Sequence, residues 1–225
     1  MTLSIADIEQ RLKGYAPPAR ENGDYALNPG MTKKKRDDEL RDAAVLILLV
    51  PKEDGSLSIL FTERTKTLHA HAGQISFPGG GVDKDDKDNR ATALREAAEE
   101  IGLNISGARV IGELEDYVTR TGFRVKPVVA VLEKDQVWTP NPGEVAKIFE
   151  VPLDFILTSG NLAEESLTFE GGERRFYAVT YDGNHIWGAT AGMLKDFSDA
   201  IAGPPPSDKT VSPARKNDAP PKSAL

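Results

Sequence analysis

The hydrophobic and polar positions of the chain change period several times, and each change predicts an element. At the N-terminus, apolar residues recur at helical spacing and predict a helix: Ile5, Ile8 and Leu12. Residues 43–51 form a continuous apolar run rich in β-branched side chains, which predicts a buried strand. The pair Asp54-Gly55 predicts a hairpin turn, with the returning strand over residues 57–62.

The middle of the chain predicts one helix and two strands. The helix covers residues 91–101 and is ended by Gly102, a residue type favoured just after a helix. Strands follow over residues 109–117 and 123–132, with a turn at 119–122. Because proline cannot donate to a β-ladder, Pro127 predicts a sheet edge or a strand start.

The last third predicts mixed elements. Residues 144–149 are expected to form a short helix, and a further turn of helix is expected near 154–157. Residues 169–181 predict a hairpin that turns near Gly171-Gly172 or continues into Asp182-Gly183, and residues 189–201 predict a final helix.

This order of elements predicts an α/β protein, an α/β/α sandwich around a mixed sheet. The strict strand–helix alternation of a wholly parallel sheet is absent. Residues 1–42 are expected to form an N-terminal helix and extension, and residues 43–202 the main domain. The proline-rich, polar residues 203–225 are expected to be a disordered tail.

Composition narrows the function classes. The formal net charge of −7 argues against broad binding of nucleic acid, and no apolar run approaches a membrane span. The absence of cysteine excludes disulfides and thiolate metal sites. The N-terminus lacks the apolar core of a signal peptide, so we expect a cytoplasmic protein, and a homodimer is left open.

Three glutamates carry the strongest chemical signal. Glu96, Glu99 and Glu100 stand at positions i, i+3 and i+4, so a helix places them on one face, where like charges repel. Hard divalent ions such as Mg²⁺ take oxygen ligands of this kind, together with water and substrate phosphates. The pattern therefore predicts a site for a metal and a phosphate.

The same region resembles the signature of the Nudix hydrolases. The residues that match it in type and spacing are Gly81, Arg95, Glu96, Ala97, Glu99, Glu100, Gly102 and Leu103. The resemblance covers about residues 43–197 and implies a Nudix-like sandwich that hydrolyses a nucleoside diphosphate linked to another group, using Mg²⁺ or Mn²⁺.

The resemblance also implies roles for single residues. Glu96 and Glu100 would bind the metal, with Glu99 as a direct or water-mediated ligand and the Gly80 carbonyl as a further one. Arg95 would orient the glutamates. The general base is left open between Glu99 and Glu144.

One position departs from the signature, since Lys87 stands where its first glutamate is expected. That glutamate mainly braces the loop, so a neighbouring aspartate can replace it: Asp83, Asp85, Asp86 or Asp88. The coenzyme A diphosphatases, a subgroup of the family, commonly lack that glutamate. The alternative interpretation of Lys87 is a catalytically silent domain that binds a nucleotide without hydrolysing it.

An upstream stretch resembles the same subgroup. The matching residues are Leu60, Thr62, Arg64, Gly73, Phe77, Pro78, Gly79 and Gly80, whereas Phe61, Thr65 and His69 depart from the pattern. The resemblance implies a small-molecule nucleotide substrate, coenzyme A or an acyl derivative. The residues that would contact its anionic groups are Arg64, His69, His71 and Gln74. For Arg64, His69 and His71, a packing role is left open beside this one. Another nucleoside diphosphate derivative is the alternative substrate.

Overall fold

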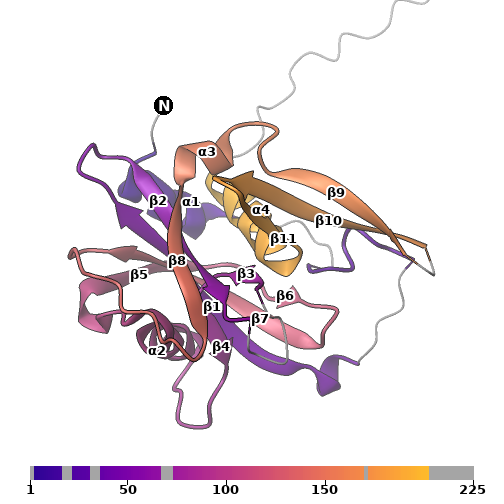
Figure 1. Cartoon of the computed structure of the whole chain (residues 1–225), viewed down its shortest axis with the longest axis horizontal. Helices are drawn as coiled ribbons and strands as arrows, with labels where there is room; N and C mark the ends of the chain where they lie inside the picture. Colours follow the sequence, from indigo (N-terminus) through magenta and orange to yellow (C-terminus); the bar gives the residue numbers. More distant parts are fainter. Residues whose placement is uncertain (1–2, 17–21, 31–35, 67–72, 170–171, 203–225) are drawn as a thin grey trace, which may run out of the picture.

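The structure, a computed structural model, describes residues 3–16, 22–30, 36–66, 73–169 and 172–202. An eight-stranded sheet follows the order β3-β2-β1-β7-β5, with β4 paired to β1, β6 to β7 and β8 to β2 (Figure 1). Its strands are β1 (Arg41–Pro51), β2 (Leu57–Arg64), β3 (Ile75–Ser76), β4 (Gly79–Gly81), β5 (Ala108–Glu113), β6 (Tyr117–Val118), β7 (Phe123–Leu132) and β8 (Val145–Pro152).

Strand β1 lies at the centre of this sheet. It pairs in parallel with β7 along one edge and antiparallel with β2 and β4 along the other. One parallel pair among antiparallel neighbours makes the sheet mixed, as predicted. The apolar run of β1 fits this position because both of its faces are covered.

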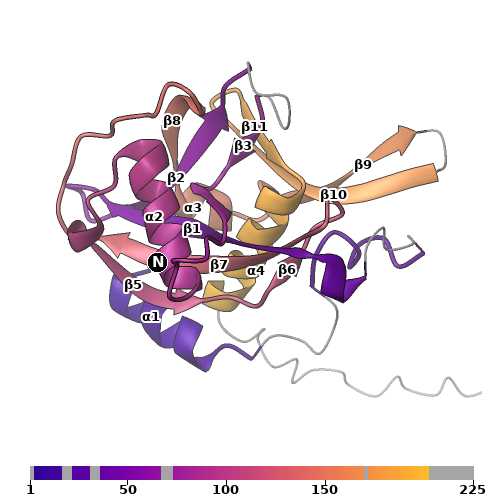
Figure 2. The ribbon, with the colours of Figure 1, turned by 90° about the horizontal axis from the view of Figure 1, so that it is seen from below.

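Alternate residues of β1 point into two separate cores. Leu46 and Leu48 pack with Ala97 and Ile101 of α2 (Asn89–Ile101), which covers one face of the sheet. Ile47 packs on the opposite face, in the core that also contains apolar residues of α1 (Ile5–Gly14) and α4 (Ala189–Ala202). The predicted α/β/α sandwich is therefore confirmed (Figure 2).

A second, three-stranded antiparallel sheet follows the order β11-β10-β9. Its strands are β9 (Ala163–Phe169), β10 (Gly172–Tyr181) and β11 (Asn184–Trp187). The sequence predicts one hairpin with two alternative turn positions. In the structure β10 pairs antiparallel with both β9 and β11, so a hairpin forms at each position, and β9 and β10 extend away from the body of the molecule (Figure 2). The short helices are η1 (Asp37–Glu39), η2 (Ile105–Gly107) and α3 (Leu153–Leu157).

Three sequence predictions require correction. The expected helix over residues 144–149 is instead the strand β8, because its backbone pairs with the edge of β2. The expected strand over residues 109–117 is divided into β5 and β6. Pro127 lies in the interior strand β7, at the gap between the residues that pair with β6 and those that pair with β5, where a missing N–H breaks no ladder.

The N-terminal residues pack closely on the rest of the chain. Helix α1 contacts β5 and α4, and Ile8 is fully buried there. Further along, Asn28 exchanges two hydrogen bonds of 2.9 Å with the backbone of Arg175. Among the described residues, no helix is long and apolar enough to cross a membrane. The predicted tail, residues 203–225, lies outside the described part.

Candidate active site

Helix α2 carries the three glutamates, and both of its ends are capped. The Asp88 carboxylate accepts a hydrogen bond of 2.8 Å from the Ala91 N–H, which satisfies a free donor of the first turn. Gly102 ends the helix in the left-handed conformation, with φ of 69°. The helix begins at Asn89, two residues before the predicted start.

The three glutamates share one helix but meet different surroundings. The Glu100 side chain is 5% exposed and the Glu96 side chain 17%, whereas the Glu99 side chain is 56% exposed. Glu96 and Glu100, called the inward glutamates below, are therefore turned toward the protein, whereas Glu99 is exposed to solvent.

The glycine strand β4 lies directly against the two inward glutamates. The Gly79 N–H donates to Glu100 Oε2 at 3.3 Å, and Gly79 has a φ of 155° that other residues rarely adopt. A Cβ on Gly80 would lie 2.5 Å from the Glu96 carboxyl carbon. The absence of a side chain at Gly80 thus allows the strand to approach the Glu96 carboxylate.

Strand β2 brings one cation to the same place. Arg64 Nη1 lies 3.9 Å from Glu100 Oε1, and the Arg64 side chain is 29% exposed. The upstream stretch and the glutamate helix, separated along the chain, therefore meet at Glu100.

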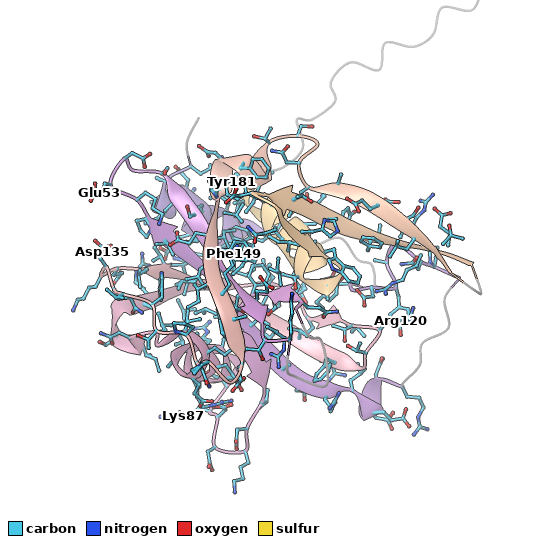
Figure 3. All side chains as sticks on the ribbon, viewed as in Figure 1. Glu53, Lys87, Arg120, Asp135, Phe149 and Tyr181 are labelled. Carbon is cyan, nitrogen blue, oxygen red and sulfur yellow. The ribbon has the colours of Figure 1, made fainter. Side chains whose placement is uncertain are left out.

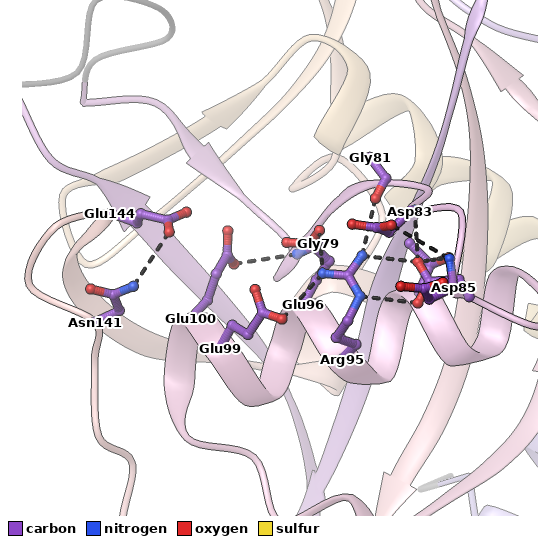
Figure 4. A network of polar contacts seen from close by, with 12 residues as sticks. Gly79, Gly81, Asp83, Asp85, Arg95, Glu96, Glu99, Glu100, Asn141 and Glu144 are labelled. Carbon is purple, nitrogen blue, oxygen red and sulfur yellow. Dashed lines mark hydrogen bonds and ion pairs between the residues drawn. The ribbon is translucent and has the colours of Figure 1, made fainter.

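Glu144 approaches from the loop before β8. The Asn141 side-chain amide donates to Glu144 Oε1 at 3.3 Å, and the Glu144 carbonyl accepts from the Thr65 N–H at 2.9 Å. The Asn141 N–H in turn donates to the Glu100 carbonyl at 2.8 Å. The loop is thus attached to both β2 and the end of α2, and its carboxylate faces the inward glutamates (Figure 4).

Arg95 links the helix to the acidic loop. Its Nε and Nη2 donate to the two Asp86 carboxylate oxygens at 3.0 and 2.9 Å. Its Nη1 lies 2.9 Å from Glu96 Oε1 and 3.3 Å from Glu99 Oε1. Asp86 is the acidic-loop residue that braces Arg95, whereas Lys87 is exposed at the surface (Figure 3).

Burial and charge disfavour ionisation of the inward pair. Burial raises the pKa of Glu100 to about 7, and the negative charges of Glu144 and Glu96 add to the rise. The Gly79 N–H and Arg64 oppose this shift only in part. Burial also raises the pKa of Glu96, against the opposing effect of Arg95. Both carboxylates are therefore short of compensating positive charge.

The residues present fit a hard divalent cation. No three His, Cys, Asp or Glu side chains converge into a closed set of ligands among the described residues. Mg²⁺ commonly uses only one or two carboxylates and completes its shell with water and substrate phosphates. Glu96 and Glu100 supply such a pair, and a cation beside them would offset their repulsion. The predicted roles of Glu99 and the Gly80 carbonyl stay predictions.

The predicted substrate-binding residues divide into two groups. Arg64 lies beside Glu100, and the Gln74 carbonyl accepts from the Arg64 N–H at 2.9 Å. His69 and His71 lie outside the described residues. Asn141 was not foreseen, although the Asn-Pro-Gly sequence before Glu144 is a turn signal that could have indicated it.

Several known proteins are similar to this chain. A MutT/nudix family protein from Enterococcus faecalis aligns with 90% of this chain and 76% of its own, with a TM-score of 0.48 and 14% identity. The uncharacterized Nudix hydrolase NudL of Photorhabdus laumondii is 35% identical over 199 residues, 88% of this chain and 98% of that protein. Nudix hydrolase 15, mitochondrial, of Arabidopsis thaliana is 39% identical over 173 residues, 74% of this chain and 59% of that protein. A model of the NUDIX domain matches residues 40–169. The domain match and the Photorhabdus relative show that the chain belongs to the Nudix family and is a Nudix hydrolase.

Proposed function

We propose that this Nudix hydrolase cleaves the diphosphate of coenzyme A or of an acyl derivative. One water is consumed, one P–O bond of the diphosphate breaks, and the products are 3′-phosphoadenosine 5′-phosphate and 4′-phosphopantetheine, which keeps its acyl group when the substrate is an acyl derivative. The meeting of two stretches supports this proposal. Arg64 and Gly79, both in the stretch that resembles the coenzyme A diphosphatases, lie 3.9 and 3.3 Å from the Glu100 carboxylate.

The inward glutamates have the role of holding metal. Nudix hydrolases generally use divalent metal ions, and for this chain we propose Mg²⁺ or Mn²⁺ held by Glu96 and Glu100. A bound ion of this kind neutralises diphosphate oxygens and lowers the pKa of a water molecule. Arg64, beside Glu100, has the role of attracting a substrate phosphate to the same point.

Two other carboxylates are candidates for the general base that accepts a proton from the attacking water. Glu144 faces the inward pair and is oriented by Asn141, whereas Glu99 is exposed and paired with Arg95. Glu144 is the better placed general base on this geometry, and Glu99 is the alternative. Arg95 acts through its neighbours, since Asp86 holds it where it can orient Glu96.

The direct test is an activity panel. Purified full-length protein is incubated with coenzyme A, acetyl-coenzyme A, a nucleotide sugar and a dinucleoside polyphosphate, each with Mg²⁺ or Mn²⁺, and the nucleotides are resolved. We expect 3′-phosphoadenosine 5′-phosphate to appear and kcat/KM to be highest for a coenzyme A substrate. Absence of this product would exclude the proposal, and a higher kcat/KM for a nucleotide sugar would favour the alternative substrate class.

The control for this panel is Glu100→Gln. The substitution keeps the shape of the side chain but removes a metal ligand, so we expect kcat to fall by several orders of magnitude with the fold retained. Turnover equal to that of the parent would reject the metal assignment. A silent nucleotide-binding domain would show no hydrolysis in either protein.

A further inference from the structure

A cavity of about 150 Å³ lies beside the glutamate site and is not used by the roles assigned so far. It is formed where β10, β11 and the start of α4 meet the segment before β3 and the turn after β6 (Figure 1). An apolar cavity of about this volume in another protein holds one benzene molecule. The space therefore suits one small chemical group and not a whole nucleotide.

Arg174 is the cation in the cavity lining. Along β10 it points to the same side as the buried Phe176, whereas Arg175 points to the opposite side and is exposed. The Arg174 side chain is only 22% exposed, and its Nη2 lies 3.5 Å from Asp24 Oδ2. Its buried Nε makes no hydrogen bond within the described residues. A guanidinium carries five N–H donors, so this partner leaves donors over.

Asp24, the acidic residue of the lining, is already occupied by other donors. Its Oδ1 accepts from the Tyr117 hydroxyl at 3.0 Å, and its Oδ2 accepts from the Arg120 N–H at 2.9 Å. Burial, and then the charge of Asp24, raise the pKa of Tyr117, so that its hydroxyl stays a neutral donor. Asp24 therefore anchors Arg174 and has little capacity left to bind a further cation.

The remaining walls contribute polar groups and one aromatic ring. The polar residues Gln74 and Thr121 and the aromatic residue Trp187 also line the cavity. The Thr190 hydroxyl donates to the Ile75 carbonyl at 3.2 Å, which fixes the start of α4 beside β3. The positive end of the α4 dipole adds to the charge of Arg174 at this place. A lining of this composition favours an anion with several acceptor oxygens.

Arg64 and Gln74 connect the cavity to the glutamates. The Arg64 N–H donates to the Gln74 carbonyl at 2.9 Å, Arg64 Nη1 lies 3.9 Å from Glu100 Oε1, and Gln74 lines the cavity. A nucleotide whose diphosphate lies at the glutamates can therefore extend one end toward Arg174.

We propose that this cavity binds a phosphate monoester of the nucleotide substrate, the 3′-phosphate on the ribose of coenzyme A. The inference rests on the proposed function and names the feature by which the site selects its substrate. Nucleotide sugars lack this phosphate, so Arg174 favours coenzyme A over them. Arg174 is a specificity residue here and takes no part in breaking the diphosphate.

The test compares two ligands that differ by one phosphate. Adenosine 3′,5′-bisphosphate and adenosine 5′-phosphate are titrated into full-length protein, and binding is followed by calorimetry and by tryptophan fluorescence. We expect Arg174→Gln to weaken the bisphosphate by about tenfold or more, as for a lost hydrogen bond to a charged group. Binding of adenosine 5′-phosphate stays unchanged. Arg175→Gln, on the opposite side of the same strand, changes neither.

Kinetics provide the second measurement. Arg174→Gln lowers kcat/KM for coenzyme A to the value for 3′-dephospho-coenzyme A, whose own value is unchanged. An equal loss for both substrates, or no loss for either, overturns the inference. If neither substrate is hydrolysed by the parent protein, the proposed function fails, while the titration still decides whether the cavity binds the 3′-phosphate.

A second variant and a second ligand test the same assignment. Arg174→Lys keeps a cation beside Asp24, so we expect it to bind the bisphosphate more tightly than Arg174→Gln and more weakly than the parent. If Arg174→Gln does not fold, Arg174→Lys takes its place, and we expect it to weaken the bisphosphate and leave adenosine 5′-phosphate binding unchanged. Inorganic phosphate is titrated separately. Binding as tight as that of the bisphosphate, and equally dependent on Arg174, would make the cavity a site for free phosphate and overturn the assignment to a nucleotide.

Discussion

Asp86 shows how a single residue can replace a missing one. It accepts two hydrogen bonds from Arg95, one from the Thr92 hydroxyl at 2.9 Å and one from the Asp83 N–H at 2.9 Å. Arg95, followed by the Asp83 N–H, holds the pKa of Asp86 well below its usual range. The brace expected from the position of Lys87 is therefore present one residue earlier.

We predict that Asp86→Asn reduces metal affinity or kcat about 10–100-fold, because Arg95 loses the charge that positions it. The ionised carboxylate stabilises the fold at pH values above the usual pKa of 3.8, and this contribution is lost as the pH falls toward the lowered value. The difference in Tm between the parent and the variant should therefore shrink in acid. Asp85→Asn, at an exposed neighbour, is the control; equal effects of the two substitutions would contradict the bracing role.

Glu100 has the opposite electrostatic character. Its pKa is raised from 4.5 to about 7, so without metal the folded state holds a proton that the unfolded chain releases. The associated stability is complete below the unfolded pKa and is lost as the pH rises through the folded pKa.

For the metal-free protein we predict that Glu100→Gln is more stable than the parent at about pH 8, by up to about 3 kcal/mol, and equally stable at about pH 4.5. Chemical denaturation with a chelator present measures this difference across pH. Glu99→Gln, at the exposed glutamate, should show no such trend. A Glu100→Gln variant that is less stable than the parent at the higher pH would show that the buried charge is already compensated.

At the scale of elements, strand β4 contains three consecutive glycines with three different surroundings. A Cβ on Gly79 would lie 2.4 Å from the Ala44 carbonyl oxygen, and one on Gly80 would meet the flexible end of Glu96. A Cβ on Gly81 would meet no atom within 4 Å. A larger residue would therefore clash with the backbone of β1 at position 79 and with the Glu96 side chain at position 80.

We predict that Gly79→Ala destabilises the fold, with about 1–3 kcal/mol from its φ alone and more from the clash. Gly80→Ala should retain stability but displace the Glu96 carboxylate and lower metal affinity or kcat about tenfold or more. Gly81→Ala should change neither. Thermal unfolding and metal titration of the three variants check this order, and a Gly80→Ala protein with full metal affinity would separate Glu96 from the metal site.

At the scale of the whole molecule, the N-terminal helix is part of the main core. Ile8 is fully buried in the cluster that contains β1, β7 and α4, although the matched NUDIX domain begins only at residue 40. The boundary between an extension over residues 1–42 and a domain over residues 43–202 stays a prediction, and the packing suggests that both parts unfold together.

We predict that Ile8→Ala lowers the free energy of unfolding by about 2–5 kcal/mol, as for a large apolar side chain removed from a core. Unfolding of the whole chain should remain a single transition shifted to lower temperature. Gln10→Ala, an exposed residue of the same helix, should cause little change. Separate transitions for the helix and the remaining chain would show that residues 1–42 are an independent unit.

The sequence alone determined the features that depend on local pattern. The apolar run of β1, the glutamate spacing of α2, the Gly102 end and the turn at Asp54-Gly55 are encoded by neighbouring residues, and so is the family signature. Such features follow from periodicity and capping within a few residues.

Tertiary structure decided what depends on distant partners. Residues 145–152 form a strand because their backbone pairs with that of β2. Pro127 is accommodated in an interior strand because β5 and β6 leave a gap opposite it. The same holds for which of four aspartates braces Arg95 and for which one of three glutamates is buried. Burial and long-range hydrogen bonds are set by contacts between segments far apart in the chain, so no local pattern could specify them.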